Sequence, residues 1–258
     1  MNKLFESKPI IISALHFPSF RLGSKYSMSW LEDYVLNNLS VFSKGGMPAV
    51  ILQDETYNEG RARPETLTVM ASVSRLAKRE FPEMNIGIII EAHDPVAALA
   101  VAHASGASFV RIKVFSGAML KSTGVQQGCG VEALDYRNSI GRNDIAVLAD
   151  VHDRTGFPLL DIPIERGASW SSKIGADGLI LTGSDHEMSM NYIRDVRNSG
   201  IQKPLLVGGG VTHENVIETL SLADGVIASS VLMRNNVEEN QIKWDLDKIL
   251  RFMDLVKN

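Results

Sequence analysis

The stretch LLVGGGVTHENVIETLSLADGVIASS, residues Leu205–Ser230, carries the clearest fold signal in this chain. An apolar run meets the triple glycine Gly208–Gly210, a helix-like segment follows, and a second apolar run ends at Ser229. Glycines let backbone N–H groups approach an anion that a side chain would block, and a helix N-terminus adds a favourable partial charge. Such sites lie after strands seven and eight of (β/α)8 barrels. The stretch therefore predicts this fold, and a phosphate site at its carboxyl-terminal face.

Length and composition limit the class of protein. The 258 residues match one (β/α)8 domain spanning 1–258, and the 45% apolar and 22% charged content is typical of a globular chain. A net charge of -4 offers no basic surface for nucleic acid. The lone Cys129 forms no internal disulfide, and the apolar run Ile10–Leu15 is too short for a membrane span or a signal peptide. We expect a cytoplasmic protein without membrane or nucleic-acid partners, and a possible homo-oligomer.

Short apolar runs alternate with longer amphipathic segments along the whole chain. Most runs are apolar on both faces, as in parallel strands buried on both sides. The predicted strands are Ile10–Leu15, Ala49–Leu52, Ile86–Ile90, Phe109–Val114, Ile145–Val151, Gly178–Thr182, Leu205–Val207 and Gly225–Ala228. Eight such units favour a closed single-domain (β/α)8 barrel, with an open doubly wound sheet as the alternative. A last helix, about Leu246–Val256, would close the barrel.

Two connections are longer than the others, Gln53–Arg63 after strand two and Ser116–Gly130 after strand four. Long loops without secondary structure are often functional lids, although each could equally be a plain surface insertion.

The strand ends supply the candidate catalytic residues, which are His16, Glu91, Arg111, Lys113 and Asp150. Arg111 and Lys113 lie two residues apart, so they share a face of their strand. Charges within an apolar strand are costly unless paired, so we expect them to point into the barrel mouth opposite Glu91 and Asp150. The set could perform acid–base chemistry, with Asp150 or Glu91 as the base, or Schiff-base chemistry at Lys113. It could also be a structural ion-pair network.

Phosphate-binding candidates follow from the glycine-rich turn and the neighbouring strand ends. They are Gly208, Gly209, Gly210, Thr182, Gly183, Ser229 and Ser230. Thr212 is the expected N-cap of the next helix. The alternative is that the glycines only make a tight turn.

A metal or a cofactor is not expected. His93, His152, Glu91 and Asp150 could together bind a divalent ion, and His16, His93 and His152 could serve a metal-dependent hydrolase. However, the sequence contains no HxH or HExxH spacing to support either metal site.

Several phrases resemble the BtpA/SgcQ family over nearly the whole chain. They are KPIIISALHFPSF, GASFVRIKVFSGA, QGCGVEALDYRNSIG, VLADVHD, LLVGGGVTHENV and ADGVIASSVL. The resemblance implies a phosphate-binding (β/α)8 barrel related in fold to phosphoribosylanthranilate isomerase. It links one branch to photosystem I biogenesis and another to sugar-utilisation operons. The family favours Lys-His-Ala after the Asp-Val of strand five, where this chain has His152-Asp153-Arg154.

These observations predict a barrel that binds a small phosphorylated metabolite, such as a sugar phosphate or a phosphoribosyl compound. The expected reaction is isomerisation, epimerisation or aldol-type cleavage. The alternatives are a non-catalytic assembly factor and a metal-dependent hydrolase.

Overall fold

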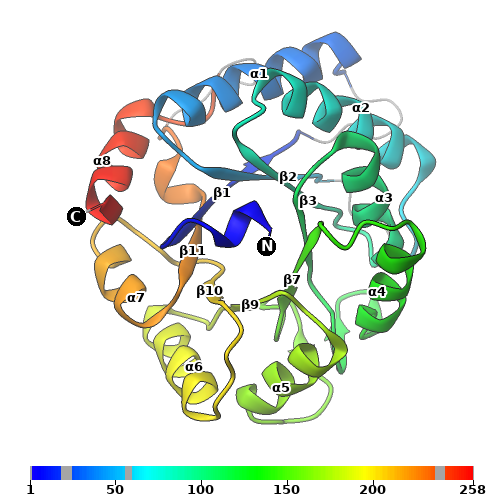
Figure 1. Ribbon diagram of the computed structural model, residues 1–258, viewed down its shortest axis with the longest axis vertical. Helices are drawn as coiled ribbons and strands as arrows, with labels where there is room; N and C mark the ends of the chain where they lie inside the picture. Colours follow the sequence, from blue (N-terminus) through cyan, green and yellow to red (C-terminus); the bar gives the residue numbers. More distant parts are fainter. Residues whose placement is uncertain (1, 19–24, 56–59, 236–241, 258) are drawn as a thin grey trace.

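Eight parallel strands close into a barrel that is surrounded by helices (Figure 1). The computed structural model describes residues 2–18, 25–55, 60–235 and 242–257. In barrel order the strands are β1 (Ile10–His16), β2 (Ala49–Gln53), β3 (Asn85–Ile89), β4 (Phe109–Ile112), β7 (Ala146–Asp150), β9 (Gly178–Leu181), β10 (Leu205–Val207) and β11 (Gly225–Ala228). The pairing of β1 with β11 closes the sheet, so the barrel is confirmed and the open sheet is excluded.

The helices occupy the outer layer. They are α1 (Met28–Lys44), α2 (Pro64–Glu80), α3 (Pro95–Ser105), α4 (Gly130–Ser139), α5 (Ile164–Ile174), α6 (His186–Asn198), α7 (Val216–Leu222) and α8 (Leu246–Lys257). Their buried side chains pack against the outward-facing residues of the strands and form the larger of two apolar clusters. Within the described residues, no helix combines the length and the apolar character that crossing a membrane would require.

The barrel interior is a separate apolar cluster that is closed at its amino-terminal end. Alternate residues of the strands point inward, and they include Ile12, Phe109 and Leu148. Leu4, from the short 3-10 helix η1 (Lys3–Phe5), joins this cluster and is 1% exposed. Figure 1 shows η1 lying across the centre of the barrel. Because this end is covered, a ligand has to reach the interior from the carboxyl-terminal end.

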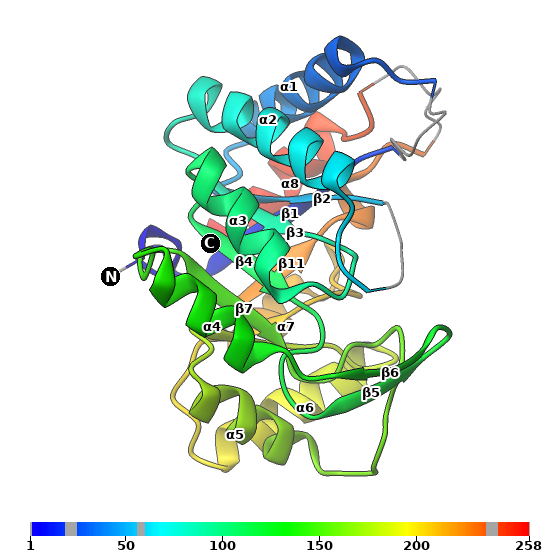
Figure 2. The ribbon, with the colours of Figure 1, turned by 90° about the vertical axis from the view of Figure 1, so that its right-hand side faces the viewer.

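The predicted loop Ser116–Gly130 contains a β-hairpin, so the expectation of a segment without secondary structure was wrong. Strands β5 (Ala118–Lys121) and β6 (Gly124–Gln127) pair with each other, and β5 also pairs with β8 (Phe157–Pro158), which makes a small antiparallel sheet. The hairpin extends beyond the carboxyl-terminal end of the barrel (Figure 2). The other predicted lid, Gln53–Arg63, includes residues 56–59, which lie outside the described residues.

Candidate functional site

The alternation that fills the barrel interior with apolar residues continues into polar residues at the carboxyl-terminal end. Two positions beyond the inward-facing Ile89, Phe109 and Leu148 come Glu91, Arg111 and Asp150. The same step along the other strands leads to Gln53, Thr182, Gly208 and Ser229, and His16 ends β1. The period of two thus carries most of the predicted site residues to one end of the barrel.

Arg111 and Asp150 form a buried bidentate ion pair. Arg111 Nε donates to Asp150 Oδ1 at 3.0 Å, and Nη2 donates to Oδ2 at 3.0 Å. Burial lowers the pKa of Arg111, but the surrounding carboxylates, Asp150 foremost and then Asp153 and Glu91, together outweigh this effect, so that the net shift is upward. Burial also raises the pKa of Asp150, and the Arg111 guanidinium opposes that rise. Arg111 is therefore a fixed cation at the base of the candidate site.

Lys113 and Glu91 form the second predicted pair. The Lys113 ammonium donates to Glu91 Oε2, and Gln53 Nε2 donates to Glu91 Oε1 at 2.9 Å. The buried carboxylate of Asp54 accepts the backbone N–H of Glu91 at 2.6 Å and so fixes the backbone there. Burial raises the pKa of Glu91 above its usual range, and Lys113 opposes this rise. The expectation that Arg111 and Lys113 pair with Asp150 and Glu91 is confirmed.

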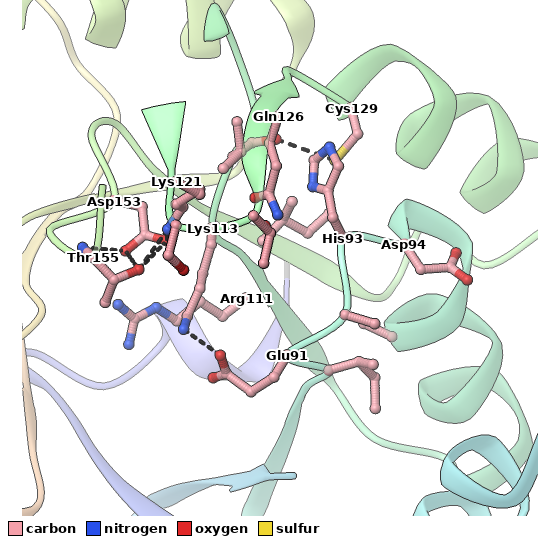
Figure 3. A pocket seen from close by; sticks show the side chains of 17 residues that line it. Glu91, His93, Asp94, Arg111, Lys113, Lys121, Gln126, Cys129, Asp153 and Thr155 are labelled. Carbon is pink, nitrogen blue, oxygen red and sulfur yellow. Dashed lines mark hydrogen bonds and ion pairs between the residues drawn. The ribbon is translucent and has the colours of Figure 1, made fainter. Parts of the chain in front are cut away.

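A cavity of about 370 Å³ opens between these ion pairs and the hairpin (Figure 3). Glu91, Arg111 and Lys113 line its inner side, and Lys121 and Gln126 line it from the hairpin. The size falls in the range of pockets that bind small molecules. The hairpin thus forms one wall of a pocket whose inner side carries acid–base groups.

Lys121 links the hairpin to the loop after β7. Its ammonium contacts the carboxylate of Asp153 and the hydroxyl of Thr155, as Figure 3 shows. Asp153 Oδ1 also accepts the backbone N–H of Thr155 at 3.0 Å. Burial raises the pKa of Asp153, but the hydrogen bonds from Lys121 and the Thr155 backbone, together with the charges of Lys113 and Lys121, outweigh burial and the net shift is downward. These contacts fix the two loops relative to each other.

His16 lies at the opposite side of the barrel mouth from this cavity and does not line it. Its Nδ1 is 2.8 Å from Glu55 Oε1, and its Nε2 is 3.1 Å from Ser229 Oγ. The Ser229 hydroxyl also donates to the Ala14 carbonyl at 3.1 Å. Since both neighbours occupy this hydroxyl, Ser229 could contact an anion only by giving up one of these contacts.

The turn after β10 differs in detail from the predicted phosphate site. The N–H of Gly183 donates to Ser189 Oγ at 2.9 Å, and the N–H of Gly208 points at the Leu181 carbonyl at 3.4 Å, so neither group is available to an anion. The N–H groups of Gly209 and Gly210, in contrast, have no acceptor within the described residues. The predicted donors that remain are the N–H groups of these two glycines and the Thr182 hydroxyl, which is buried next to Gly208 and has no hydrogen-bond partner among the described residues. Ser230 lies on the adjacent strand end, at the start of the 3-10 helix η2 (Ser230–Leu232).

The helix that follows this turn starts later than expected, and the N-cap assignment to Thr212 was wrong. The N-cap of α7 is Asn215. The Asn215 side chain instead holds the turn together, because Nδ2 donates to the Gly210 carbonyl at 2.9 Å and Oδ1 accepts the N–H of Thr212 at 2.7 Å. Gly209 and Gly210 are therefore separated from the helix end by a further turn, and the helix dipole adds little there.

The structure does not bring the proposed metal ligands together. Glu91 and Asp150 are paired with cations, His93 Nε2 lies 2.8 Å from the Gln127 carbonyl oxygen, and His152 Nε2 faces α5. In the part of the chain that the structure describes, no three His, Cys, Asp or Glu residues are grouped to hold a metal ion. Burial raises the pKa of Cys129 to about 12, so its thiol is not poised as a nucleophile.

Several residues of the site were missed from sequence. Gln53 donates to Glu91, Lys121 and Asp153 pair with each other at the wall of the cavity, and Arg154 lies against Gly209. Arg154 lies in the segment His152-Asp153-Arg154, where the sequence departs from the Lys-His-Ala of the family, and this departure could have indicated a role for Arg154. Lys121 gave none, because its role depends on a hairpin that was not predicted.

Fold and site together define a (β/α)8 barrel with a buried acid–base layer at the carboxyl-terminal ends of its strands, where barrels of this kind place their functional residues. The sequence profile of the BtpA family matches residues 6–258, and the chain belongs to this family.

Relatives of known name include the photosystem I biogenesis protein BtpA of Synechocystis sp., which is 29% identical over 91% of this chain and 84% of its own length. The putative sgc region protein SgcQ of Escherichia coli is 26% identical over 93% of this chain and 88% of its own length.

Solved structures share the fold at low sequence identity. A phosphoribosylanthranilate isomerase of Pyrococcus furiosus has a TM-score of 0.58 and 15% identity, over 96% of this chain and 98% of its own. KGPDC of Streptococcus mutans in complex with D-ribose 5-phosphate has a TM-score of 0.57 and 12% identity, over 96% and 97%. At sequence identities this low, the similarity to these structures shows a shared fold alone.

Proposed function

We propose that the chain is an enzyme that binds a small phosphorylated metabolite, a sugar phosphate or a phosphoribosyl compound, and acts on it as an isomerase or a lyase. One observation carries the proposal: at the open end of the barrel, the buried Arg111–Asp150 ion pair lies between the glycine turn and the Lys113–Glu91 ion pair. Arg111 belongs to both regions, because its Nη2 lies 3.5 Å from where a Cβ on Gly208 would be. An anchored phosphate would therefore leave the rest of a small substrate near the acid–base groups.

Proton transfer is the chemistry that these side chains support best. Glu91 is the candidate base, because burial shifts its pKa upward, toward the range where a carboxyl can both take and return a proton. Lys113 and Arg111 are cations that could stabilise an enediolate or a similar anion. Asp150 in this scheme orients Arg111 rather than exchanging protons itself.

Schiff-base chemistry at Lys113 is the weaker alternative. Burial lowers the pKa of Lys113, but the carboxylates of Glu91 and Asp153 together outweigh burial and the net shift is upward. An amine must lose its proton before it can attack a carbonyl, and Glu91 favours the ammonium form. We expect no mass adduct on Lys113 when the protein is treated with borohydride and sugar phosphates, and an adduct there would restore this mechanism.

Two of the solved structures that share the fold are consistent with this substrate class. KGPDC was solved with D-ribose 5-phosphate, and the isomerase named above acts on a phosphoribosyl compound according to its name. Because these neighbours share only the fold, the substrate class rests on the site of this chain.

Hydrogen exchange tests the proposal without requiring a known product. The protein is incubated in D2O with a panel of sugar phosphates, and loss of a substrate C–H signal is followed by NMR. We expect exchange for at least one compound, its loss in Glu91→Gln, and its retention in Glu83→Gln, which removes the same charge from an exposed position. If no phosphorylated compound in the panel exchanges or raises the melting temperature, the proposal fails.

A second candidate is a protein-binding role of the kind that the name of the Synechocystis relative implies. An exposed apolar row favours it: Leu120, Val125 and Phe157 are paired across the small sheet and are 47%, 53% and 75% exposed. Such a role would tolerate changes at the strand ends. If Glu91→Gln supports the partner-dependent process in a cell as well as the wild type does, that outcome favours this candidate over the enzyme.

A further inference from the structure

Arg154 is a cation in contact with the glycine turn that no carboxylate of the described residues neutralises. It lies in the turn after β7, and its side chain is exposed. Its Nη1 and Cζ lie 3.0 and 3.3 Å from where a Cβ on Gly209 would be, so the guanidinium packs against the Gly209 backbone. Whereas Arg111 is paired with Asp150, no described Asp or Glu lies within ion-pair distance of Arg154.

The backbone beside Arg154 offers hydrogen-bond donors of its own. Within the described residues, the N–H groups of Gly209 and Gly210 donate to nothing. Gly210 has a φ of 74°, which turns the chain sharply at this point, and Asn215 holds the turn in place. Two backbone N–H groups without an acceptor thus lie next to a guanidinium without a carboxylate partner, and the turn that carries the N–H groups is held by Asn215. Consecutive N–H groups in such a turn form a concave site that suits an anion.

The loop that carries Arg154 is fixed from both sides. Asp153 and Thr155 flank it, and Asp153 accepts both the backbone N–H and the hydroxyl of Thr155 at 3.0 Å. Lys121 from β5 contacts the same two side chains. Because this network fixes the backbone on each side of Arg154, the flexible side chain starts from a fixed position next to the glycine turn.

We propose that Arg154 is the side chain that binds the phosphate group of the substrate, together with the N–H groups of Gly209 and Gly210. The inference rests on the proposed function and deepens it, because it assigns the anion to a side chain that the sequence did not single out. A phosphate monoester presents three oxygens in different directions. Two can face the planar guanidinium while another faces the backbone N–H groups. A carboxylate has one oxygen fewer and lies in a plane, so we expect the site to bind phosphate monoesters more tightly than carboxylates.

Isothermal titration with D-ribose 5-phosphate, and separately with inorganic phosphate, tests this assignment. We expect Arg154→Gln to weaken the binding of both by at least tenfold, and Arg154→Lys to restore only part of the loss. Arg166→Gln is the matched control, because it removes the same charge from an exposed position on α5 and should bind as the wild type does. Arg154 is exposed, so its replacement should leave the fold intact.

Three outcomes would overturn the inference. If Arg154→Gln binds as the wild type does while Gly209→Asp does not, the glycine turn binds phosphate without Arg154, and the proposed function survives. If Arg166→Gln weakens binding equally, the effect comes from net charge alone. If the wild type binds neither compound nor any other sugar phosphate, the proposed function fails together with the inference.

Discussion

At the scale of single residues, the charged side chains of the candidate site are buried as ion pairs. The Arg111 and Asp150 side chains are 14% and 4% exposed, and the buried Glu91 carboxylate faces Lys113. A buried ion pair contributes little net stability, whereas a buried charge without its partner is costly. Such pairs are therefore weak evidence for a stabilising role. Two of them side by side at the open end of a barrel are better explained by chemistry there.

A double-mutant cycle on Arg111 and Asp150 checks this energetic argument. We expect Arg111→Met to lower the free energy of unfolding by about 3–5 kcal/mol, because it leaves the Asp150 carboxylate buried without its cation. The double variant Arg111→Met, Asp150→Leu should recover most of the loss, since no buried charge remains. Urea unfolding measures all four proteins. Additive losses in the double variant would show that the two side chains do not act as a pair.

The three glycines of the turn should respond differently to alanine. A Cβ on Gly208 would lie 2.4 Å from Ile180 Cγ2 and 2.6 Å from Thr182 Oγ1, so overpacking should cost about 1–3 kcal/mol. A Cβ on Gly210 meets no atom, but its φ of 74° strains a side chain by roughly 1–2 kcal/mol. A Cβ on Gly209 comes closest to the far end of the long Arg154 side chain, so its effect on stability should stay within about 0.5 kcal/mol.

Urea unfolding of the three alanine variants, alongside phosphate titration, separates packing from binding. Gly209→Ala should be the variant that keeps its stability and weakens phosphate binding. If Gly209→Ala is as unstable as Gly208→Ala, then the Arg154 side chain cannot give way at the turn.

At the scale of elements, the hairpin and the segment after β7 are joined by the pairing of β5 with β8 and by a buried ion pair. The side chains of Lys121 and Asp153 are 11% and 3% exposed. This pair connects two segments that have no place in the barrel itself, and between them they carry Lys121 and Arg154. The positions of Lys121 and Arg154 at the open end of the barrel thus depend on contacts between these two segments and not on the barrel strands alone.

Asp153→Asn should destabilise the protein in a pH-dependent way. The hydrogen bonds to Asp153 lower its folded pKa below the unfolded value. Its contribution is therefore present above the usual aspartate pKa of about 3.9 and is lost as pH falls through the folded pKa. We expect the variant to lose about 3 kcal/mol at pH 7, and less below about pH 4.

Urea unfolding across this pH range measures the difference. Asp144→Asn is the control, since Asp144 pairs with Arg142 on the surface and is 64% exposed. Its loss should stay below about 0.5 kcal/mol. If the Asp153→Asn difference does not shrink in acid, the carboxylate of Asp153 is not what the pair depends on.

Elements of the barrel were predictable from sequence, and those outside it were not. Each barrel strand carries enough consecutive apolar residues to be identified from the sequence. The largest difference between a predicted and an observed strand end is at β4, which ends at Ile112 where Val114 was predicted. The hairpin strands are only four residues long, and among their residues only Met119 is buried, so their apolar pattern is weak. Asn215 was missed as the N-cap of α7 because Thr212 is an equally good cap by residue type.

At the scale of the whole molecule, the two ends of the barrel have different roles. The amino-terminal end is covered by η1, and Asn2 fixes that segment by donating to the carbonyls of Ser108 and Asp144 at 2.7 and 2.6 Å. The carboxyl-terminal end carries the polar layer. The alternation of residue types along the strands predicted this polarity. Which donors remain free could not be predicted, because Ser189 and Leu181 take up the N–H groups of Gly183 and Gly208 only in the folded chain.

This separation predicts that a change at the covered end alters stability without altering the site. Leu4→Ala removes a side chain that is 1% exposed at the floor of the barrel and should lower the free energy of unfolding by about 2–4 kcal/mol. Val131→Ala, at a position that is 61% exposed, should cost less than about 0.5 kcal/mol. Both variants should bind D-ribose 5-phosphate as the wild type does at a temperature where they are folded. Weaker binding by Leu4→Ala would mean that interior packing transmits strain along the strands to the glycine turn, so that the two ends are energetically coupled.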